Sequence, residues 1–194
     1  IDTPLGEILE LSVRHRLAIF SAHTNLDSVK GGLNDFFADK IGLKNLSVFI
    51  PDEIDPLHPV DHPHGIGRVG ELVTPTSLAA FSEKIKSEFR LSTLKVSGPL
   101  DMTVKKIAVC TGSGSGLMKQ FFATDADVYI TGDLKFHDAK DAQMNHRGLI
   151  DVGHFASEVI MIDLIADRLS AQIKEKGLDV RVEVGHEVLS KSSE

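Results

Sequence analysis

Residues 153–158 (GHFASE) place an imidazole and a carboxylate where they could bind one metal ion. Gly153 follows an expected strand and a helix is expected from about Phe155, so His154 and Glu158 are neighbours across the first helical turn. Such a pair can reach one ion at about 2.0–2.2 Å. The alternative is a hydrogen-bonded loop histidine beside a glutamate that interacts favourably with the helix dipole.

Residues 21–27 (SAHTNLD) repeat this arrangement. His23 and Asp27 have the same four-residue spacing after another expected strand, although Asp27 alone could simply cap the next helix. Two such segments at one edge of a sheet favour a shared site. We therefore predict a metal site formed by His23, Asp27, His154 and Glu158. Mixed imidazole and carboxylate ligation suits Zn, Mn, Fe or Ni and disfavours a calcium site.

A third polar segment, residues 131–138 (TGDLKFHD), also follows an expected strand. Asp133 and His137 could support the metal ligands, position a water or carry protons, since ligand histidines usually have a carboxylate or carbonyl partner. Alternatively, Asp133 caps a helix and His137 is a partly buried surface residue. We place these two residues in the catalytic part of the predicted site.

The glycine loop at residues 111–116 (TGSGSG) lies between a strand and a helix, as a nucleotide-binding loop would. Its glycine spacing does not fit the dinucleotide fingerprint, and the Lys-Ser/Thr of a P-loop is absent. The backbone at Gly112 and Gly114 could still bind an anion of the substrate. A tight turn that lets strand and helix pack closely is the alternative. Cys110, within an apolar strand, is expected in the core.

These segments need elements that bring them together, and the hydrophobic pattern predicts alternating helices and strands. Such alternation indicates an α/β fold with mostly parallel strands flanked by helices, in which a ligand site lies at the carboxyl ends of the strands. Helices are expected at about 4–16, 28–39, 77–89, 117–123, 135–146 and 156–175, and strands at 17–22, 46–50, 68–73, 94–96, 106–110, 128–131, 149–152 and 180–184.

Composition limits the classes of partner. The chain has 194 residues, 42% of them hydrophobic, and a net charge of −7 with scattered basic residues, which argues against direct binding of nucleic acid. Its apolar runs are far shorter than the roughly 20 residues of a membrane span. One cysteine cannot form an internal disulfide, which suits a reducing compartment. We expect a soluble, cytoplasmic protein that acts on a small molecule.

Residues 51–66 hold four of the seven prolines and three histidines, so this segment is expected to be a loop and a candidate boundary between two lobes. Otherwise residues 1–194 are expected to form one α/β unit. The chain starts at Ile1 and enters a helical pattern almost at once. We interpret this start as the remainder of a longer chain.

Several blocks together resemble the NIF-three-like family, also known as type 2 GTP cyclohydrolase I. They are SAHTNLD followed by KGGLND, then GIGRVGEL, VCTGSGS, DVYITGDLKFHDA and DVGHFASE, in that order from about residue 8 to residue 185. The resemblance implies a two-lobed α/β protein with a dinuclear metal site in a cleft. It also implies assembly into a toroidal homohexamer built from dimers.

The resemblance assigns metal binding to Asp27, His154 and Glu158, with His23 beside them. The family's site also uses an adjacent His-His pair upstream, whereas only His15 precedes His23 in this chain. This difference implies that an N-terminal segment of the family is missing here. The family usually has Glu where Asp133 stands.

By resemblance, the function is that of a dinuclear metal-dependent hydrolase. Two divalent ions can activate water and polarise a carbonyl, imine or phosphoryl group, and the family label suggests opening of the purine ring of GTP with release of formate. A shared fold does not fix a substrate. The alternative is a non-enzymatic metal-binding scaffold or regulatory interaction protein, and phosphoester hydrolysis is a third possibility.

Overall fold

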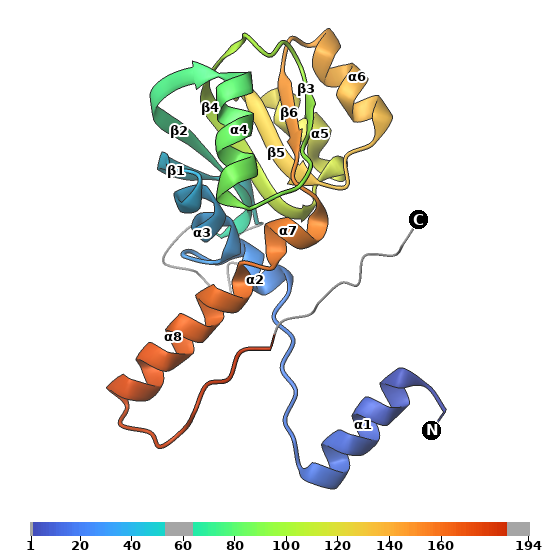
Figure 1. Cartoon of the computed structure of the whole chain (residues 1–194), viewed down its shortest axis with the longest axis vertical. Coiled ribbons are helices and arrows are strands. Elements are labelled where there is room, and N and C mark those ends of the chain that lie inside the picture. The colour runs from blue at the N-terminus through green and yellow to red at the C-terminus, as the bar shows by residue number, and fades with distance from the viewer. Residues whose placement is uncertain (1, 53–63, 186–194) are drawn as a thin grey trace.

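One six-stranded sheet forms the centre of the molecule in the computed structural model, which describes residues 2–52 and 64–185. The strand order is β1-β2-β4-β5-β6-β3 (Figure 1). The strands are β1 (Leu43–Pro51), β2 (Gly65–Ser77), β3 (Lys95–Ser97), β4 (Thr103–Ser113), β5 (Val128–Gly132) and β6 (Gly148–Asp151). The α/β class predicted from the sequence is confirmed.

The sheet is mixed rather than mostly parallel, which corrects the predicted strand directions. β4, β5 and β6 are parallel to one another, whereas β1 pairs with β2, β2 with β4, and β3 with β6 in antiparallel fashion. The hydrophobic pattern of a buried strand carries no information on its direction, and an antiparallel edge can complete a parallel centre. The parallel centre, β4-β5-β6, is the part that presents the predicted site.

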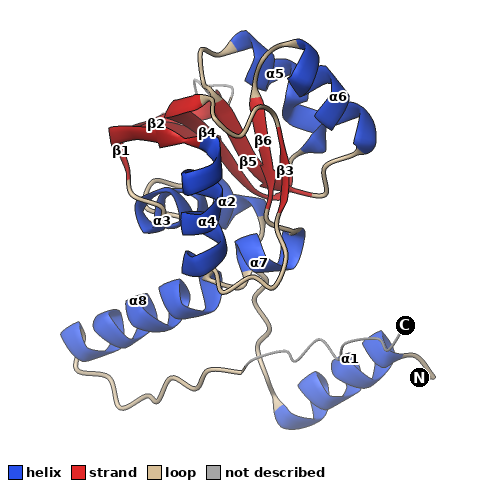
Figure 2. Ribbon diagram, turned by 45° about the horizontal axis from the view of Figure 1, so that its top comes forward, coloured by secondary structure: helices blue, strands red, loops and turns tan. Residues whose placement is uncertain are grey.

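Helices cover both faces of the sheet (Figure 2). On one face Leu33 and Phe37 pack with Leu78 and Phe81, and on the other Phe121 and Ala142 pack near Tyr129. The helices are α1 (Pro4–His15), α2 (Thr24–Ser28), α3 (Leu33–Lys40), α4 (Leu78–Glu88), α5 (Met118–Ala123), α6 (Phe136–Met144), α7 (His154–Glu158) and α8 (Met161–Glu175), with a 3-10 turn at Ser115–Leu117.

Two predicted helices differ in their bounds. The helix expected at 28–39 begins only at Leu33, as α3, and a separate short helix, α2, ends at Ser28, because the chain turns between them at Gly31, whose φ is +70°. A side chain at Gly32 would also lie 2.0 Å from the carbonyl oxygen of Leu26. The helix expected at 156–175 begins earlier, at His154, and is divided into α7 and α8.

Two predicted strands do not form. Residues 17–22 are extended and connect α1 to the rest of the molecule (Figure 1). Residues 17–21 are exposed, with Phe20 83% exposed. No backbone hydrogen bond joins residues 18–22 to another described residue. Residues 180–184 are also without strand structure. Each segment has strand-like composition, but a strand needs a neighbour, and no described strand pairs with either one.

The predicted loop at 51–66 lies largely outside the described residues, which resume at His64. The strands on its two sides pair with each other, since Pro51 is opposite Gly65. The described helices include none that is long and apolar enough to span a membrane.

Candidate metal centre

The predicted His154 and Glu158 lie together where the chain leaves the parallel centre of the sheet. β6 ends at Asp151, Gly153 turns the chain with a φ of +82°, and α7 begins at His154. The helical spacing brings Nε2 of His154 to 3.2 Å from Oε1 of Glu158. The side chains are 48% and 33% exposed, so solvent reaches both.

Asp133 comes from the end of the neighbouring strand β5 and contacts the other nitrogen of the same imidazole. Oδ2 of Asp133 lies 2.8 Å from Nδ1 of His154. Asp133 adopts a left-handed backbone conformation, with a φ of +58°, directly after the strand. Its hydrogen bond is the main cause that raises the pKa of His154, with a smaller contribution from the charge of Glu158 and an opposing one from burial. Asp133 and His154 are therefore in direct contact.

The glycine loop at the end of β4 approaches the same pair. At Gly112 the φ is +74°, and a side chain there would place its Cβ 2.4 Å from Oε1 of Glu158 and 3.5 Å from Nε2 of His154. The backbone N–H of Gly112 donates to Oγ of Ser157, which in turn donates to the carbonyl of His154. The glycine therefore lets the loop lie directly against His154 and Glu158, and Ser157 links the loop to α7.

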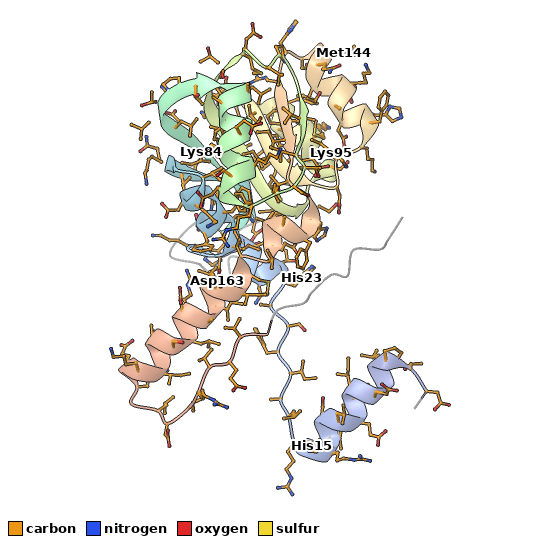
Figure 3. The ribbon with its side chains drawn as sticks, in the orientation of Figure 1. His15, His23, Lys84, Lys95, Met144 and Asp163 are labelled. Atoms are coloured by element: carbon orange, nitrogen blue, oxygen red, sulfur yellow. The ribbon has the colours of Figure 1, made fainter. Side chains whose placement is uncertain are left out.

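Asp27 faces this group from α2. Its pKa is raised, first by burial and then by the negative charge of Glu158, whereas His23 and His154 lower it. These interactions indicate that Asp27, Glu158 and both histidines share one electrostatic environment. His23 is exposed at the start of α2 (Figure 3), where its Nδ1 lies 3.1 Å from the hydroxyl of Thr24.

Two predicted site residues lie elsewhere. His137 is exposed on α6, with its ring against Phe136 at a centroid distance of 5.8 Å, and no described hydrogen bond or ion pair joins it to Asp133 or His154. A side chain at Gly114 would meet Thr131 and the hydroxyl of Tyr129 rather than His154 or Glu158. The absence of a side chain at Gly114 therefore allows the loop to pack closely against β5, which agrees with the tight-turn alternative.

Cys110 is core, as expected. It is 5% exposed, and burial raises the pKa of its thiol to about 12. A thiol with so high a pKa is a poor nucleophile at neutral pH.

Sequence reasoning missed two residues that organise the site, Asn34 and Ser157. Asn34 is fully buried, accepts from the backbone N–H of Thr111 and donates to the carbonyl of Asp27. Ser157 lies within the GHFASE block, and its place between the two predicted ligands, His154 and Glu158, was an available signal. For Asn34 the sequence offers no signal of a partner 77 positions away.

The donor set suits a divalent cation, although the side chains are not arranged around one. Within residues 2–52 and 64–185, no group of three or more His, Cys, Asp or Glu side chains has a metal-binding arrangement. Both nitrogens of His154 are engaged by carboxylates. Because Asp133 holds Nδ1, Nε2, which faces Glu158, is the atom that a metal would bind. This is the usual pattern of a carboxylate-supported histidine ligand. The space that a Cβ at Gly112 would fill lies beside the same atom.

Comparison with protein families gives a match over nearly the whole chain. The Duf34/NIF3 (NGG1p interacting factor 3) family matches residues 1–188. A Streptococcus pneumoniae protein named "GTP cyclohydrolase 1 type 2 homolog" is 32% identical over 183 residues, covering 92% of this chain and 65% of that protein. A Clostridium perfringens protein of the same name is 35% identical over 172 residues, covering 89% and 63%. The chain thus spans less than two thirds of the length of these relatives.

Solved structures agree on the fold. A Staphylococcus aureus protein superposes with a TM-score of 0.85 at 25% identity, covering 100% of this chain and 75% of the other. The structure of reduced HcgD from Methanocaldococcus jannaschii has a TM-score of 0.68 at 29% identity, covering 87% and 63%. The sheet and its helices are therefore those of known members of this fold.

Proposed function

Because this chain belongs to the Duf34/NIF3 family, we propose that it is part of a metal-dependent hydrolase in which Asp27, His154 and Glu158 hold two divalent ions. The observation that carries the proposal is the crowding of carboxylates around one imidazole. Asp133 and Glu158 contact the two nitrogens of His154, and burial together with the charge of Glu158 raises the pKa of Asp27. A bound cation would favour the ionised form of each carboxylate and offset their mutual repulsion.

The chain's own residues would have distinct parts. Asp133 fixes the ring of His154 through Nδ1, so that Nε2 remains available as a ligand atom. Gly112 brings the loop backbone against the ligands without a side chain in the way. When bound, divalent ions activate water and polarise the group under attack. Zn, Mn, Fe and Ni all fit this donor set.

For the substrate we propose a small molecule of the nucleotide class, specifically GTP. Two relatives carry the name GTP cyclohydrolase 1 type 2 homolog. The corresponding reaction uses water to open the purine ring of GTP and releases C8 as formate. The backbone of the glycine loop around Gly112 is the proposed contact for an anionic part of the substrate.

The test is formate release from GTP by purified protein with added Mn²⁺, Zn²⁺ or Fe²⁺. Replacing Asp27 with Asn or Glu158 with Gln should abolish turnover and lower metal occupancy while the fold persists. Glu88→Gln is a matched control, since Glu88 pairs with Lys40 away from the site. Turnover that persists in the Asp27 and Glu158 variants would contradict the proposal.

His137 is kept as a proposed proton carrier. If it has this role, His137→Ala should cost on the order of 10² to 10⁴ in rate while the metal content is unchanged. An unchanged rate would remove His137 from the catalytic residues.

A second candidate function is that of a metal-binding scaffold. It is favoured by the exposed apolar side chains of α1, namely Leu5, Ile8, Leu9, Leu11 and Val13, which suit contact with another protein. The family description also names an interacting factor. Absence of turnover of GTP and of a panel of phosphoesters by metal-replete protein would favour the scaffold.

Assembly into a homohexamer built from dimers remains a proposal based on the family resemblance. An isologous dimer interface would be its building unit. Sedimentation of the protein as a monomer at micromolar concentration would contradict it.

A further inference from the structure

The chain just after Asp27 is held by a buried arginine on β2. Arg68 is 3% exposed, and its guanidinium donates to the carbonyls of Ser28 and Val29 at 3.3 and 3.1 Å. It also donates to the carbonyls of Gly65 and Gly67 in its own strand, at 2.9 and 2.7 Å. The end of α2 is thereby fixed to the central sheet.

The charge of this arginine is balanced by the next helix. Asp35, in the first turn of α3, accepts from Nε and Nη2 of Arg68 at 2.7 and 3.0 Å, a two-point contact that fixes direction as well as distance. Asp35 also accepts from the backbone N–H of Gly31 at 2.6 Å. Arg68 therefore holds the start of the turn between α2 and α3, and Asp35 holds the turn at Gly31.

Asn34 completes the connection to the metal centre. Its Nδ2 donates to the carbonyl of Asp27 at 3.2 Å, and its Oδ1 accepts from the backbone N–H of Thr111 at 2.9 Å. Thr111 immediately precedes Gly112, which lies against Glu158. One fully buried amide thus joins the backbone of one proposed ligand to the loop that borders another.

We propose that Asn34, Asp35 and Arg68, here called the α2–α3 clamp, position Asp27 relative to Glu158 and His154. Asn34 and Arg68 are positioning residues because they act on the backbone around Asp27 rather than on a bound group. Asn34 is a buried amide with hydrogen bonds at both its nitrogen and its oxygen. The buried guanidinium of Arg68 joins the turn after α2, Asp35 on α3 and its own strand, so this segment has little freedom. The inference rests on the proposed metal site.

The first test measures the Mn²⁺ affinity of the full chain by calorimetric titration, with the thermal midpoint of the metal-free protein recorded in parallel. Asn34→Ser cannot span both partners, and Arg68→Lys keeps the charge but loses the forked contacts. Each should weaken Mn²⁺ binding roughly 10- to 100-fold, the range found when groups that support ligands are removed. Asp27→Asn serves as the direct ligand variant.

Arg147→Lys is the matched control. Arg147 also donates to two backbone carbonyls, those of Ala126 and Thr124, but on the connection leading into β5. It should lower the thermal midpoint without changing Mn²⁺ affinity. If Asp27→Asn weakens binding but neither clamp variant does, the clamp proposal is overturned and the metal site stands.

Hydrogen exchange of the metal-free protein gives a readout that does not depend on the metal. In Asn34→Ser, peptides covering residues 24–30 and 110–114 should lose protection together, although they are far apart in sequence. Arg147→Lys should leave both protected. Loss of protection in only one of the two peptides, or in neither, would overturn the α2–α3 clamp. This result does not depend on whether Asp27→Asn supports or contradicts the proposed metal site.

Discussion

The absent side chain of Gly112 is what allows the glycine loop to reach Glu158. Replacing Gly112 with Ala should displace the carboxylate, because the new Cβ would lie 2.4 Å from Oε1, and should strain a backbone with a φ of +74°. We expect a loss of roughly 1–2 kcal/mol in the free energy of unfolding and weaker binding of Mn²⁺. Urea denaturation and calorimetric titration would measure the two effects.

The same loop provides the control for this substitution. Gly116 has open space where a Cβ would stand, with no heavy atom within 4 Å. Gly116→Ala should therefore leave both stability and Mn²⁺ affinity close to those of the starting protein. Equal effects of the two substitutions would contradict the close approach of Gly112 to Glu158.

His154 should make the stability of the metal-free protein depend on pH. Its pKa is raised above the ordinary 6.5, mainly by the hydrogen bond that its Nδ1–H donates to Asp133, so the folded state favours the imidazolium. This stabilisation is complete below the unfolded-state pKa and is lost as pH rises through the folded-state pKa. The stability difference between the starting protein and His154→Gln should therefore shrink as the pH rises above the ordinary histidine pKa of 6.5.

Urea denaturation in the presence of a chelator would measure that difference. Asp133→Asn removes the main cause of the raised pKa, so it should remove most of the pH dependence while the ring of His154 remains. A stability difference that grows with pH would show that the sign is wrong.

Among the elements, α7 owes its place to Ser157. The hydroxyl of Ser157 accepts from the N–H of Gly112 in a buried environment, so Ser157→Ala should leave that donor without a partner and cost about 1–3 kcal/mol of unfolding free energy. Ser157→Thr retains a hydroxyl and should cost less. Both values are accessible from denaturant midpoints.

Ser82 on α4 is the matched comparison. It is 6% exposed, and its hydroxyl has no hydrogen-bond partner among the described residues. Ser82→Ala removes a buried hydroxyl that makes no hydrogen bond among the described residues. The substitution should therefore leave the free energy of unfolding unchanged or raise it. If both alanine substitutions cost the same, the bond to Gly112 does not anchor α7.

Local spacing was enough to predict the pair on α7. His154 and Glu158 follow from a four-residue spacing at a strand end, a relation that depends only on helix geometry. Asn34 and Arg68 could not be predicted, because their partners are set by tertiary packing, as with the contact of Asn34 to Thr111. Tertiary packing also decides where a predicted element fails. Residues 18–22 have a strand-like sequence pattern, but they form no strand because no neighbouring strand pairs with them.

At the scale of the whole molecule, the parallel centre of the sheet explains why the convergence of candidate residues could be predicted. The directions of the edge strands could not be. β4, β5 and β6 end at one edge, so Gly112, Asp133 and His154 converge there. The antiparallel directions of β1, β2 and β3 depend on the path that the chain takes between strands. The hydrophobic pattern of a strand does not encode that path. The hydrophobic core lies between the sheet and its helices.

The extended segment that leads from α1 to the body of the molecule should be the first point at which a protease cuts. Leu17 and Phe20 are 59% and 83% exposed, and both are residues after which chymotrypsin cleaves. Brief digestion should separate α1 from a resistant fragment that contains the sheet, and mass spectrometry would locate the cut. If neighbouring copies cover this segment in an assembly, cleavage should slow as protein concentration rises; a rate per molecule that is the same at all concentrations would show that the segment stays open to solvent.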